Sequence, residues 1–500
     1  MGQPEALSPD WDARLEEEGQ TAPRVVGARR GADLCRRLAR WRPGYLPLIV
    51  AYIVIVASDY WSNGPTPGTL GWPLTVLWTW PIFTTLTGII GIRRTRQALR
   101  RSAERWAGQG VTTIDDLLVV AVPTVGRDDT YPALERSVRS YLDHLPRCFP
   151  RLRIDLVVDE GCEAAERIAE LAASSDAVRL VTVPEGYRTP NGTRFKARAS
   201  HYLHELRIRE GEARDDVWVL HMDDDTGVGP DTALAMARFI AEQAAGGEGP
   251  PRHLAQGILT YPREYARNRL TWLADSARPA EDVGRFSAWT GSGTPRAGVH
   301  GELLLVRASI EATIGWDFGP RSLVEDAQFA LIFSARYPGH SAWFAGRCYG
   351  ASPATMRDFF RQRERWSWGL AALVFNRSLQ LRNRVLLGYS VLSWVVGPIQ
   401  NVGVVMLLAV LIADPNTSPV TALVIPVWAL NMAYVVWMYW EGLRVNAEVS
   451  RRGRRRWWEP VAVVMLIPIF GLMEGIPGLR GFIKFARREE NRFAVIAKPS

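Results

Sequence analysis

Long apolar stretches at both ends of the chain constrain its fold more than any other feature of the sequence. Residues 44–61 and 70–92, near the start, are each close to the about 20 residues that a helix needs to cross a lipid bilayer. Residues 384–413 and 418–443, near the end, are long enough as well. Charged residues fill the region between these two pairs. We therefore predict two membrane helices on each side of a central water-exposed domain.

A fifth apolar stretch, residues 460–485, is harder to interpret. It is interrupted by Pro468, Glu474 and Pro477, and basic residues lie on both sides of it. We predict a re-entrant or interfacial hairpin that returns to the cytoplasm, with a full crossing as the alternative.

The distribution of charge indicates how these segments are oriented. The chain carries 60 Lys and Arg against 52 Asp and Glu, a formal net charge of +8. The basic residues gather beside the apolar stretches, in RRLARWR, IRRTRQALRR and RRGRRRWW, whereas the loops SNGPTPGT and DPNT hold none. The positive-inside rule then predicts a multi-pass protein of the cell membrane with a cytoplasmic central domain. Basic residues placed in this way argue against a nucleic-acid partner.

The two ends of the chain and its cysteines add little chemistry. Residues 1–43 have no signal-peptide order and are predicted to be a largely disordered, basic cytoplasmic tail. Residues 486–500 are predicted to be a second cytoplasmic tail. The four cysteines are scattered without a CxxC pair, so neither a zinc site nor a disulfide framework is indicated.

Residues 113–375 show the pattern of an α/β domain. Apolar runs predict strands at 117–125, 153–161, 178–184 and 217–225, and helices at 131–142 and 162–174. Such alternation favours a mostly parallel sheet, in which ligands bind beyond the carboxyl ends of the strands. The polar residues of VPTV, VVDEG and HMDDD all follow strands, so we expect them at one edge of the sheet.

Three consecutive aspartates follow the apolar run VWVLHM. Asp223, Asp224 and Asp225 repel one another, so a positive partner is expected there. The D-x-D pair Asp223 and Asp225 fits one divalent cation, Mg²⁺ or Mn²⁺, that would hold a diphosphate leaving group. The alternative is a helix N-cap or an acidic surface turn. Asp224 is expected to tolerate change best.

Two further clusters suggest chemistry. Glu325 and Asp326 precede an apolar helical run, where a carboxylate would serve as a general base or, alternatively, as a helix cap. In RQRERW, Gln362, Arg365 and Trp366 would share one helix face. That face offers a cation and an aromatic platform for a sugar and its phosphate, or it marks an amphipathic helix at a membrane interface.

Taken in order, VVDEG, HMDDD, VED and RQRERW resemble the hallmark D…DxD…(E)D…(Q/R)xxRW of processive-type family 2 glycosyltransferases, whose relatives include cellulose and hyaluronan synthases. The resemblance covers about residues 115–370. A closer resemblance is to the Egghead-type β-1,4-mannosyltransferases, which lengthen a glucosyl-lipid from GDP-mannose. The residues that carry it are 183–205, HMDDDTG and 293–307. The resemblance implies a GT-A α/β domain inserted between transmembrane helices.

The resemblance also implies roles for single residues at the donor side. Asp159, with Thr124 and Glu160, would bind the nucleoside, and Lys196 would approach the base or the diphosphate. Glu160 stands where many members of the family have a second aspartate. Asp223 and Asp225 would hold the metal and the diphosphate, with Asp225 as the more direct ligand.

At the acceptor side, the resemblance makes Asp326 the catalytic base. Gln362, Arg365 and Trp366, together with Glu325, would embrace the diphosphate and the acceptor end. His300 and Glu302 in VHGE would line the acceptor pocket, although a structural role for this pair is an equal alternative.

The function implied is that of an inverting glycosyltransferase. It would move a hexose from a nucleotide-diphosphate sugar to a lipid-linked or glycan acceptor, in contact with membrane lipids, and the product linkage would be β. The donor stays open between GDP-mannose, UDP-glucose and UDP-N-acetylhexosamine. A processive polysaccharide synthase with translocation and an inactive membrane scaffold are the alternatives.

Overall fold

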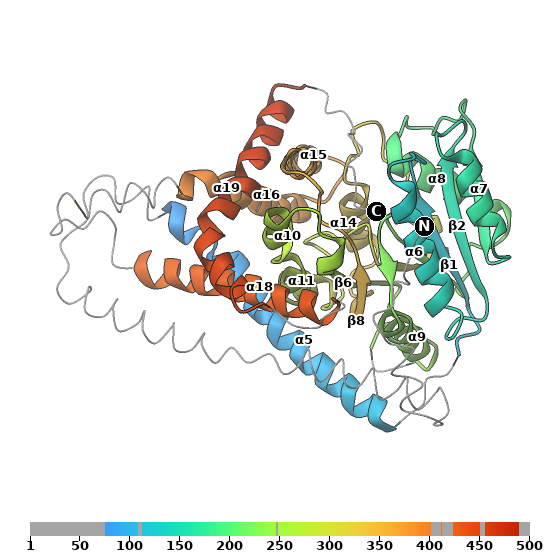
Figure 1. The fold of residues 1–500 in the computed structure, drawn as a ribbon, viewed down its shortest axis with the longest axis horizontal. Helices are drawn as coiled ribbons and strands as arrows, with labels where there is room; N and C mark the ends of the chain where they lie inside the picture. Colours follow the sequence, from blue (N-terminus) through green and yellow to red (C-terminus); the bar gives the residue numbers. More distant parts are fainter. Residues whose placement is uncertain are drawn as a thin grey trace.

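The computed structural model describes residues 76–108, 113–246, 249–401, 412, 424–450 and 456–489. An α/β unit occupies one side of the molecule and a group of helices the other (Figure 1). The predicted first membrane segment, 44–61, lies outside the described residues, as do the two predicted tails apart from residues 486–489.

The α/β unit is built on one mixed sheet of eight strands, in the order β3-β2-β1-β4-β7-β6-β8-β5. The strands are Leu117–Pro123 (β1), Leu152–Asp159 (β2), Val178–Val183 (β3), Val217–His221 (β4), Gly227–Val228 (β5), Leu254–Thr260 (β6), Leu304–Arg307 (β7) and Ser341–Tyr349 (β8). The first four are parallel, as predicted. The remainder is mixed, because β7 runs antiparallel to both β4 and β6. The prediction of a mostly parallel sheet is therefore confirmed for one half only.

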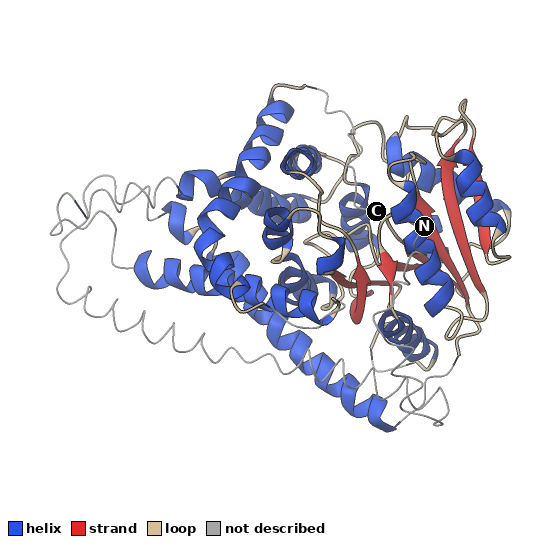
Figure 2. Cartoon of the chain, viewed as in Figure 1, coloured by secondary structure: helices blue, strands red, loops and turns tan. Residues whose placement is uncertain are grey.

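Helices cover both faces of the sheet (Figure 2). They are Tyr131–His144 (α6), Ala165–Ala173 (α7), Phe195–Arg209 (α8), Pro230–Ala244 (α9), Ala308–Ile314 (α13) and Glu325–Arg336 (α14). Alternate residues of β1 point to opposite faces, as strand geometry requires. Leu118 and Val120 pack with α6, α7 and α9, whereas Val119 and Ala121 pack with α8 and α14. Apolar residues are thus buried on both faces, which places the polar chemistry at the strand ends.

The remaining helices pack beside β6 and β8, in the mixed half of the sheet. The longer ones are Ile82–Gly108 (α5), Met356–Val374 (α15), Leu381–Val395 (α16), Val424–Glu448 (α18) and Glu459–Ala486 (α19). Short turns between β6 and β7 connect them to the sheet: Arg263–Tyr265 (η1), Arg269–Asp275 (α10), Arg278–Glu281 (α11), the π-helical Asp282–Phe286 (η2) and Ser287–Thr290 (α12). We call α5, α15, α16, α18 and α19 the helix bundle.

The last apolar stretch forms one continuous helix, α19, rather than the predicted hairpin. Pro468 and Pro477 both lie inside it, so each removes one backbone donor without breaking the helix. In the described part of the chain, α19 is the one helix with the length and apolar composition to cross a bilayer. The predicted segments 384–413 and 418–443 contain most of α16 and most of α18, but parts of both segments lie outside the described residues.

A buried carboxylate joins three elements beneath the carboxyl end of β4. Glu311 of α13 is fully buried and accepts hydrogen bonds from Arg207 Nη2 of α8 at 2.6 Å and from Trp316 Nε1 at 2.6 Å. His221 Nε2, at the end of β4, lies 2.9 Å from Oε1, the same oxygen that accepts from Trp316. Burial opposes the charge on Glu311, but Arg207 and His221 hold its pKa well below the usual range.

We expect Glu311→Gln to destabilise the fold strongly, because it leaves the Arg207 guanidinium buried without its counter-charge. Removing one partner of a buried pair typically costs about 3–5 kcal/mol. The thermal midpoint of the purified variant measures the effect. Glu210→Gln is the matched control, since it removes a partly exposed carboxylate that lies 2.8 Å from Arg179. Equal midpoints for the two variants would contradict the expectation.

Candidate active site

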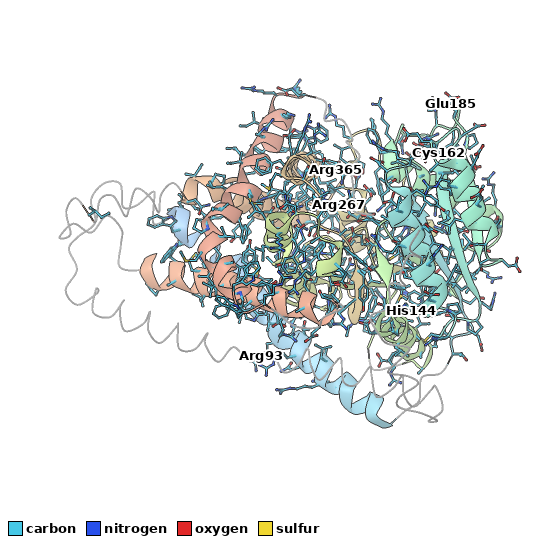
Figure 3. The ribbon with its side chains drawn as sticks, viewed as in Figure 1. Arg93, His144, Cys162, Glu185, Arg267 and Arg365 are labelled. Atoms are coloured by element: carbon cyan, nitrogen blue, oxygen red, sulfur yellow. The ribbon has the colours of Figure 1, made fainter. Side chains whose placement is uncertain are left out.

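One cavity of about 900 Å³ runs from the carboxyl edge of the parallel strands into the helix bundle. Its lining includes most of the predicted site residues: Thr124, Asp159, Lys196, Asp223, His300, Glu302, Glu325, Asp326, Gln362, Arg365 and Trp366. Arg365, on α15, lies near the middle of the molecule (Figure 3). Two predicted site residues, Glu160 and Asp225, do not line the cavity.

The parallel strands bring their carboxyl ends to this cavity, as predicted. Thr124 follows β1, and its hydroxyl donates to Asp224 Oδ2 at 2.8 Å. Asp159 ends β2 and accepts from Arg198 Nη1 at 2.6 Å. Thr124, Asp159 and Asp224 therefore share one wall of the cavity.

Glu160 departs from the expected arrangement. Its side chain points away from the cavity and accepts a hydrogen bond from the backbone N–H of Glu185 at 3.0 Å. Glu185 lies at the outer corner of the α/β unit, far from Arg365 (Figure 3). The reason is geometric, since successive residues at a strand end point in opposite directions. The structure thus brings Asp159 to the cavity and leaves Glu160 outside it.

The aspartates after β4 meet a third carboxylate. Carboxylate oxygens of Asp223, Asp225 and Glu302 all lie within 4.8 Å of one another. The antiparallel register pairs His221 with Leu304, so two residues further on Asp223 faces Glu302. Glu302 was expected in the acceptor pocket, and spacing along the sequence gives no sign of this neighbour. Three carboxylates at this distance are oxygen ligands of the kind that Mg²⁺ and Mn²⁺ prefer.

Lys196 provides positive charge at this cluster. Its ammonium group is ion-paired with Asp223 and lies 3.8 Å from Glu325 Oε1. Burial disfavours the charged form, but Asp223 and Glu325 outweigh it and raise the pKa of Lys196 above its usual value. A side chain at Gly301 would come within 2.9 Å of the Lys196 ammonium and 3.4 Å of Asp326 Oδ2. Glycine at this position therefore keeps the space between the cation and Asp326 open.

Glu325 and Asp326 occupy the first turn of α14, where Glu325 is buried and Asp326 is half-buried. The N-cap of α14 is Val324, so neither carboxylate is the capping residue. Asp326 Oδ1 accepts from the backbone N–H of Ala327 at 2.7 Å. Burial raises the pKa of Glu325 to about 7 and also raises the pKa of Asp326 above its usual value, while Lys196 acts in the opposite direction on both. A raised pKa suits a carboxylate that takes up a proton near neutral pH.

The RQRERW segment lies on α15 and turns the expected face toward the cavity. Gln362, Arg365 and Trp366 all line it. Arg363, which the sequence did not single out, is fully buried between them and donates to the Gln362 side-chain oxygen. The guanidinium carbons of Arg278 and Arg363 lie 4.4 Å and 4.7 Å from the centre of the Trp366 ring. Two cations therefore fix the position of the indole.

His300 lines the cavity, and its side chain also contacts two residues of the π-helical turn η2. Its Nε2 lies 2.6 Å from Asp282 Oδ1 in the π-helical turn, and its ring packs against Phe286 with centroids 4.5 Å apart. Burial disfavours a charged imidazole, but Asp282 raises the pKa of His300 above its usual value. Both roles considered for this residue, lining the pocket and supporting it, are compatible with this position.

Two non-glycine residues beside the site adopt left-handed backbone conformations. Phe195, with φ of 59°, precedes Lys196, and Leu303, with φ of 53°, follows Glu302. In the described residues the one other non-glycine case is Arg488, outside the cavity. Such conformations cost energy and are common where a fold positions functional groups.

Part of this site lies in a region that is similar to a known family of proteins. Residues 218–440 match the model of glycosyl transferase family group 2. This part of the chain is therefore similar to family 2 glycosyltransferases. The match begins within β4 and extends into α18.

Two β-1,4-mannosyltransferases are similar to this chain at about the same level of identity. The chain is 29% identical to the β-1,4-mannosyltransferase egh of Drosophila melanogaster over 325 residues, which are 64% of this chain and 66% of the fly protein. It is 30% identical to the β-1,4-mannosyltransferase bre-3 of Caenorhabditis elegans over 258 residues, 51% of this chain and 54% of that one. The chain thus spans less than two thirds of the length of these relatives.

Among solved structures, a mannosyltransferase of Pyrobaculum calidifontis in complex with GDP-Man and Mn²⁺ is similar to the chain. The TM-score is 0.42 at 14% identity, and the match covers 84% of this chain and 99% of that one.

Proposed function

We propose that this protein is a membrane-associated, inverting glycosyltransferase that moves a hexose, with mannose from GDP-mannose as the first candidate, onto a lipid-linked acceptor through a β linkage. The observation that carries the proposal is the single cavity lined by Asp223 of the D-x-D pair, by Glu325 and Asp326, and by the QxxRW face of α15. The names of the fly and nematode relatives support mannose as the transferred sugar.

The donor would bind at the sheet end of the cavity. Asp159 and Thr124 would contact the nucleoside, and Lys196 and Arg365 would face the diphosphate. Asp223, Asp225 and Glu302 fit a divalent cation, Mg²⁺ or Mn²⁺, because all three offer carboxylate oxygens within 4.8 Å of one another. When bound, the cation would neutralise charge on the leaving diphosphate. In this proposal Glu302 belongs to the donor end rather than to the acceptor pocket.

The reaction would be a single displacement at the anomeric carbon. The acceptor hydroxyl forms the new C–O bond as the bond to the diphosphate breaks, so an α-linked donor gives a β-linked product. Asp326 takes the hydroxyl proton, because its pKa is raised by burial and its side chain faces the open space at Gly301. Arg365 and Lys196 hold the leaving group, and positioning supplies much of the rate.

Membrane association is supported by the outer surface of the bundle. Along α19, large apolar side chains recur with high exposure: Val461 at 60%, Met465 at 73%, Ile469 at 45%, Ile476 at 40% and Ile483 at 39%. Spacings of four and seven residues place them on one side of the helix. A stripe of this kind is expected to face lipid. Arg480, Lys484, Arg487 and Arg488 gather at the carboxyl end of α19, where a cytoplasmic, anionic membrane surface would attract them.

The organisation proposed for the whole chain follows the sequence-based expectation. It comprises a cytoplasmic tail (1–43), two transmembrane helices (44–92), a cytoplasmic GT-A catalytic domain ending in an interfacial helix (113–375), two further transmembrane helices (384–443), a transmembrane or interfacial segment (460–485) and a second cytoplasmic tail (486–500). Cysteine accessibility to a membrane-impermeant reagent in intact cells would test the orientation of each part.

One assay distinguishes the proposed function from its alternatives. Purified protein is supplied with GDP-mannose, UDP-glucose or UDP-N-acetylhexosamine, Mg²⁺ or Mn²⁺, and glycolipid acceptors, and the product is sized by mass spectrometry. A single added hexose with a β linkage supports the proposal. A long glycan would indicate a processive synthase, and no nucleotide release from any donor would indicate an inactive scaffold.

The rate should fall at acid pH with a midpoint above the ordinary carboxyl range of about 4. Asp326 must be ionised to accept a proton, and its raised pKa means that the active form is lost as pH falls through that value. The charged groups that act on it are Lys196, His300, Asp223, Glu325 and Arg365. The profile of kcat/KM between pH 4.5 and 9 measures the midpoint. His300→Gln should move it to higher pH by removing a positive charge that lowers the pKa of Asp326, whereas an unchanged midpoint would contradict this coupling.

A further inference from the structure

The cavity does not end at Asp326 but continues between α5, α16, α18 and α19. The lining of this inner part, which we call the bundle end, combines polar and aromatic groups with apolar side chains such as Leu387, Met432 and Ile467. It includes Thr85, Ser390, Asn401 and Asn431, the indoles of Trp78, Trp394 and Trp428, and the carboxylate of Glu474. Helices with apolar outer faces therefore turn amide, hydroxyl and indole groups toward a shared interior.

Hydrogen bonds between the helices hold this lining in place. The Thr85 hydroxyl donates to Asn431 Oδ1 at 2.7 Å, which joins α5 to α18. The indole N–H of Trp394 on α16 donates to the backbone carbonyl of Glu474 on α19 at 2.9 Å. The side chains that line the bundle end are thus held in fixed positions, as in a surface that orients a ligand.

The charges at the entrance to the bundle end are balanced in pairs. Arg363 lies 3.0 Å from Glu474 Oε1, and Arg278 lies 3.0 Å from Asp275 Oδ1. The Glu474 side chain nevertheless keeps 27% of its surface exposed, whereas Arg363 and Asp275 keep 1% each. Arg278 keeps 17%, so the Glu474 carboxylate is the most exposed charged group of this network.

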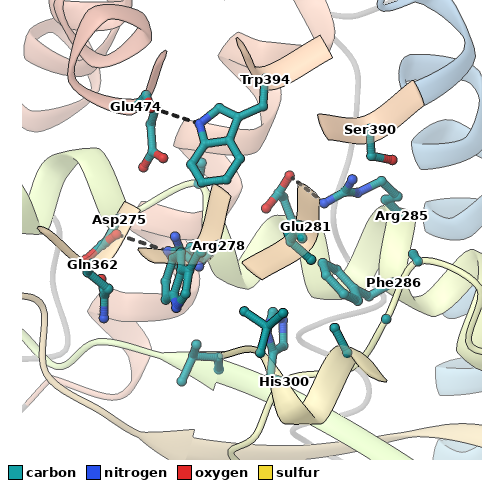
Figure 4. A pocket seen from close by; sticks show the side chains of 18 of the residues that line it. Asp275, Arg278, Glu281, Arg285, Phe286, His300, Gln362, Ser390, Trp394 and Glu474 are labelled. Carbon is teal, nitrogen blue, oxygen red and sulfur yellow. Dashed lines mark hydrogen bonds and ion pairs between the residues drawn. The ribbon is translucent and has the colours of Figure 1, made fainter. Parts of the chain in front are cut away.

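Trp394 and Glu474 lie together on the bundle side of the pocket, facing Arg278 and Gln362 (Figure 4). An indole face beside a carboxylate suits a sugar ring, because the ring stacks on the aromatic surface while its hydroxyls donate to the carboxylate. Gln362 continues this wall toward Trp366 and the expected base. The two residues are thus placed beyond the reaction centre, on the path toward the bundle.

We infer that Trp394 and Glu474 form a sugar-binding subsite that holds the acceptor's carbohydrate headgroup while its alkyl chain lies among the bundle helices. The inference rests on the proposed function, since it assigns the acceptor of that reaction to particular residues of α16 and α19. It adds specificity residues outside the D-x-D, ED and QxxRW motifs.

The test measures binding of octyl β-glucoside to the full-length protein in phosphatidylcholine nanodiscs by saturation-transfer NMR, with octylphosphocholine as the probe for the chain alone. Glu474→Gln and Trp394→Leu should each weaken glucoside binding about tenfold, because a charge-assisted hydrogen bond or a stacking surface is lost. The affinity for GDP, measured by calorimetry, should stay the same in both variants.

The chain offers a matched control for each variant. Glu364 on α15 also pairs with α19, through Lys484 and through Arg480 at 3.5 Å, but it does not line the cavity. Trp440 on α18 also donates to a backbone carbonyl of α19, that of Pro460 at 3.0 Å, and it too lies outside the lining. Glu364→Gln and Trp440→Leu therefore break the same kinds of helix contact, and both should bind the glucoside like the unmodified protein.

The outcomes separate this inference from the proposed function. Equal losses in the variants and their controls, or wild-type protein that binds no glucoside, would overturn the subsite. Selective loss in Glu474→Gln and Trp394→Leu supports it, even if no nucleotide sugar supports transfer. Absence of transfer from every nucleotide sugar would instead refute the proposed function.

Discussion

Replacing Asp326 with Asn should lower the transfer rate by about 10²–10⁴-fold, the usual contribution of a general base. The amide keeps the size of the carboxylate and can still accept the hydrogen bond that the Ala327 N–H donates at 2.7 Å. It cannot take the proton of an attacking hydroxyl. Initial rates with saturating donor and acceptor measure the loss.

Binding of the donor should survive this change, so that a loss of catalysis can be distinguished from a loss of donor binding. The affinity for GDP, measured by calorimetry, is expected to stay close to that of the unmodified protein. Glu325→Gln serves as the comparison, because it changes the neighbouring buried carboxylate in the same turn of α14. We expect its rate to fall less than that of Asp326→Asn. Normal turnover by Asp326→Asn would refute the assignment of the base.

Replacing Asp225 with Asn should weaken binding of Mn²⁺ and slow transfer on the order of 10²–10³-fold, as loss of a group that stabilises a leaving oxyanion does. Asp225 is 1% exposed, and its carboxylate lies within 4.8 Å of those of Asp223 and Glu302. The amide is a poorer ligand because it carries no charge. Titration of Mn²⁺ followed by electron paramagnetic resonance reports the binding without any turnover.

Asp224→Asn is the matched control for this prediction. It makes the same chemical change one residue away, and the new amide oxygen can still accept from the Thr124 hydroxyl, 2.8 Å from the present carboxylate. Glu302→Gln should give an effect between the two, as a third ligand would. If Asp224→Asn and Asp225→Asn weakened Mn²⁺ equally, the cluster of Asp223, Asp225 and Glu302 would not be the metal site.

Parts of the site were predictable because they depend on local pattern and on the rule that parallel strands share their carboxyl edge. Apolar runs that end at Thr124, Asp159 and Asp223 placed all three at one cavity. Helical spacing likewise placed Gln362 and Trp366 on one face of α15. In each case the residues that determine the geometry are close neighbours in the chain.

Other parts could not be predicted because distant segments decide them. A short apolar strand such as β7 does not encode the direction in which it pairs, and it is this antiparallel register that brings Glu302 beside Asp223. The ion pair of Arg363 with Glu474 joins residues 111 positions apart. The predicted position of Glu160 was wrong for a different reason, since spacing along the sequence does not show which side of a strand end a residue faces.

The continuity of the cavity between the sheet and the bundle has a consequence for how such an enzyme would respond to its surroundings. The donor would arrive from water and the acceptor from the plane of the lipid, each through its own end of one space. Turnover would then depend on the mole fraction of acceptor in the membrane and not on its amount per volume of solution. Adding inert lipid at constant total acceptor should slow the reaction, as diluting a reactant in two dimensions does.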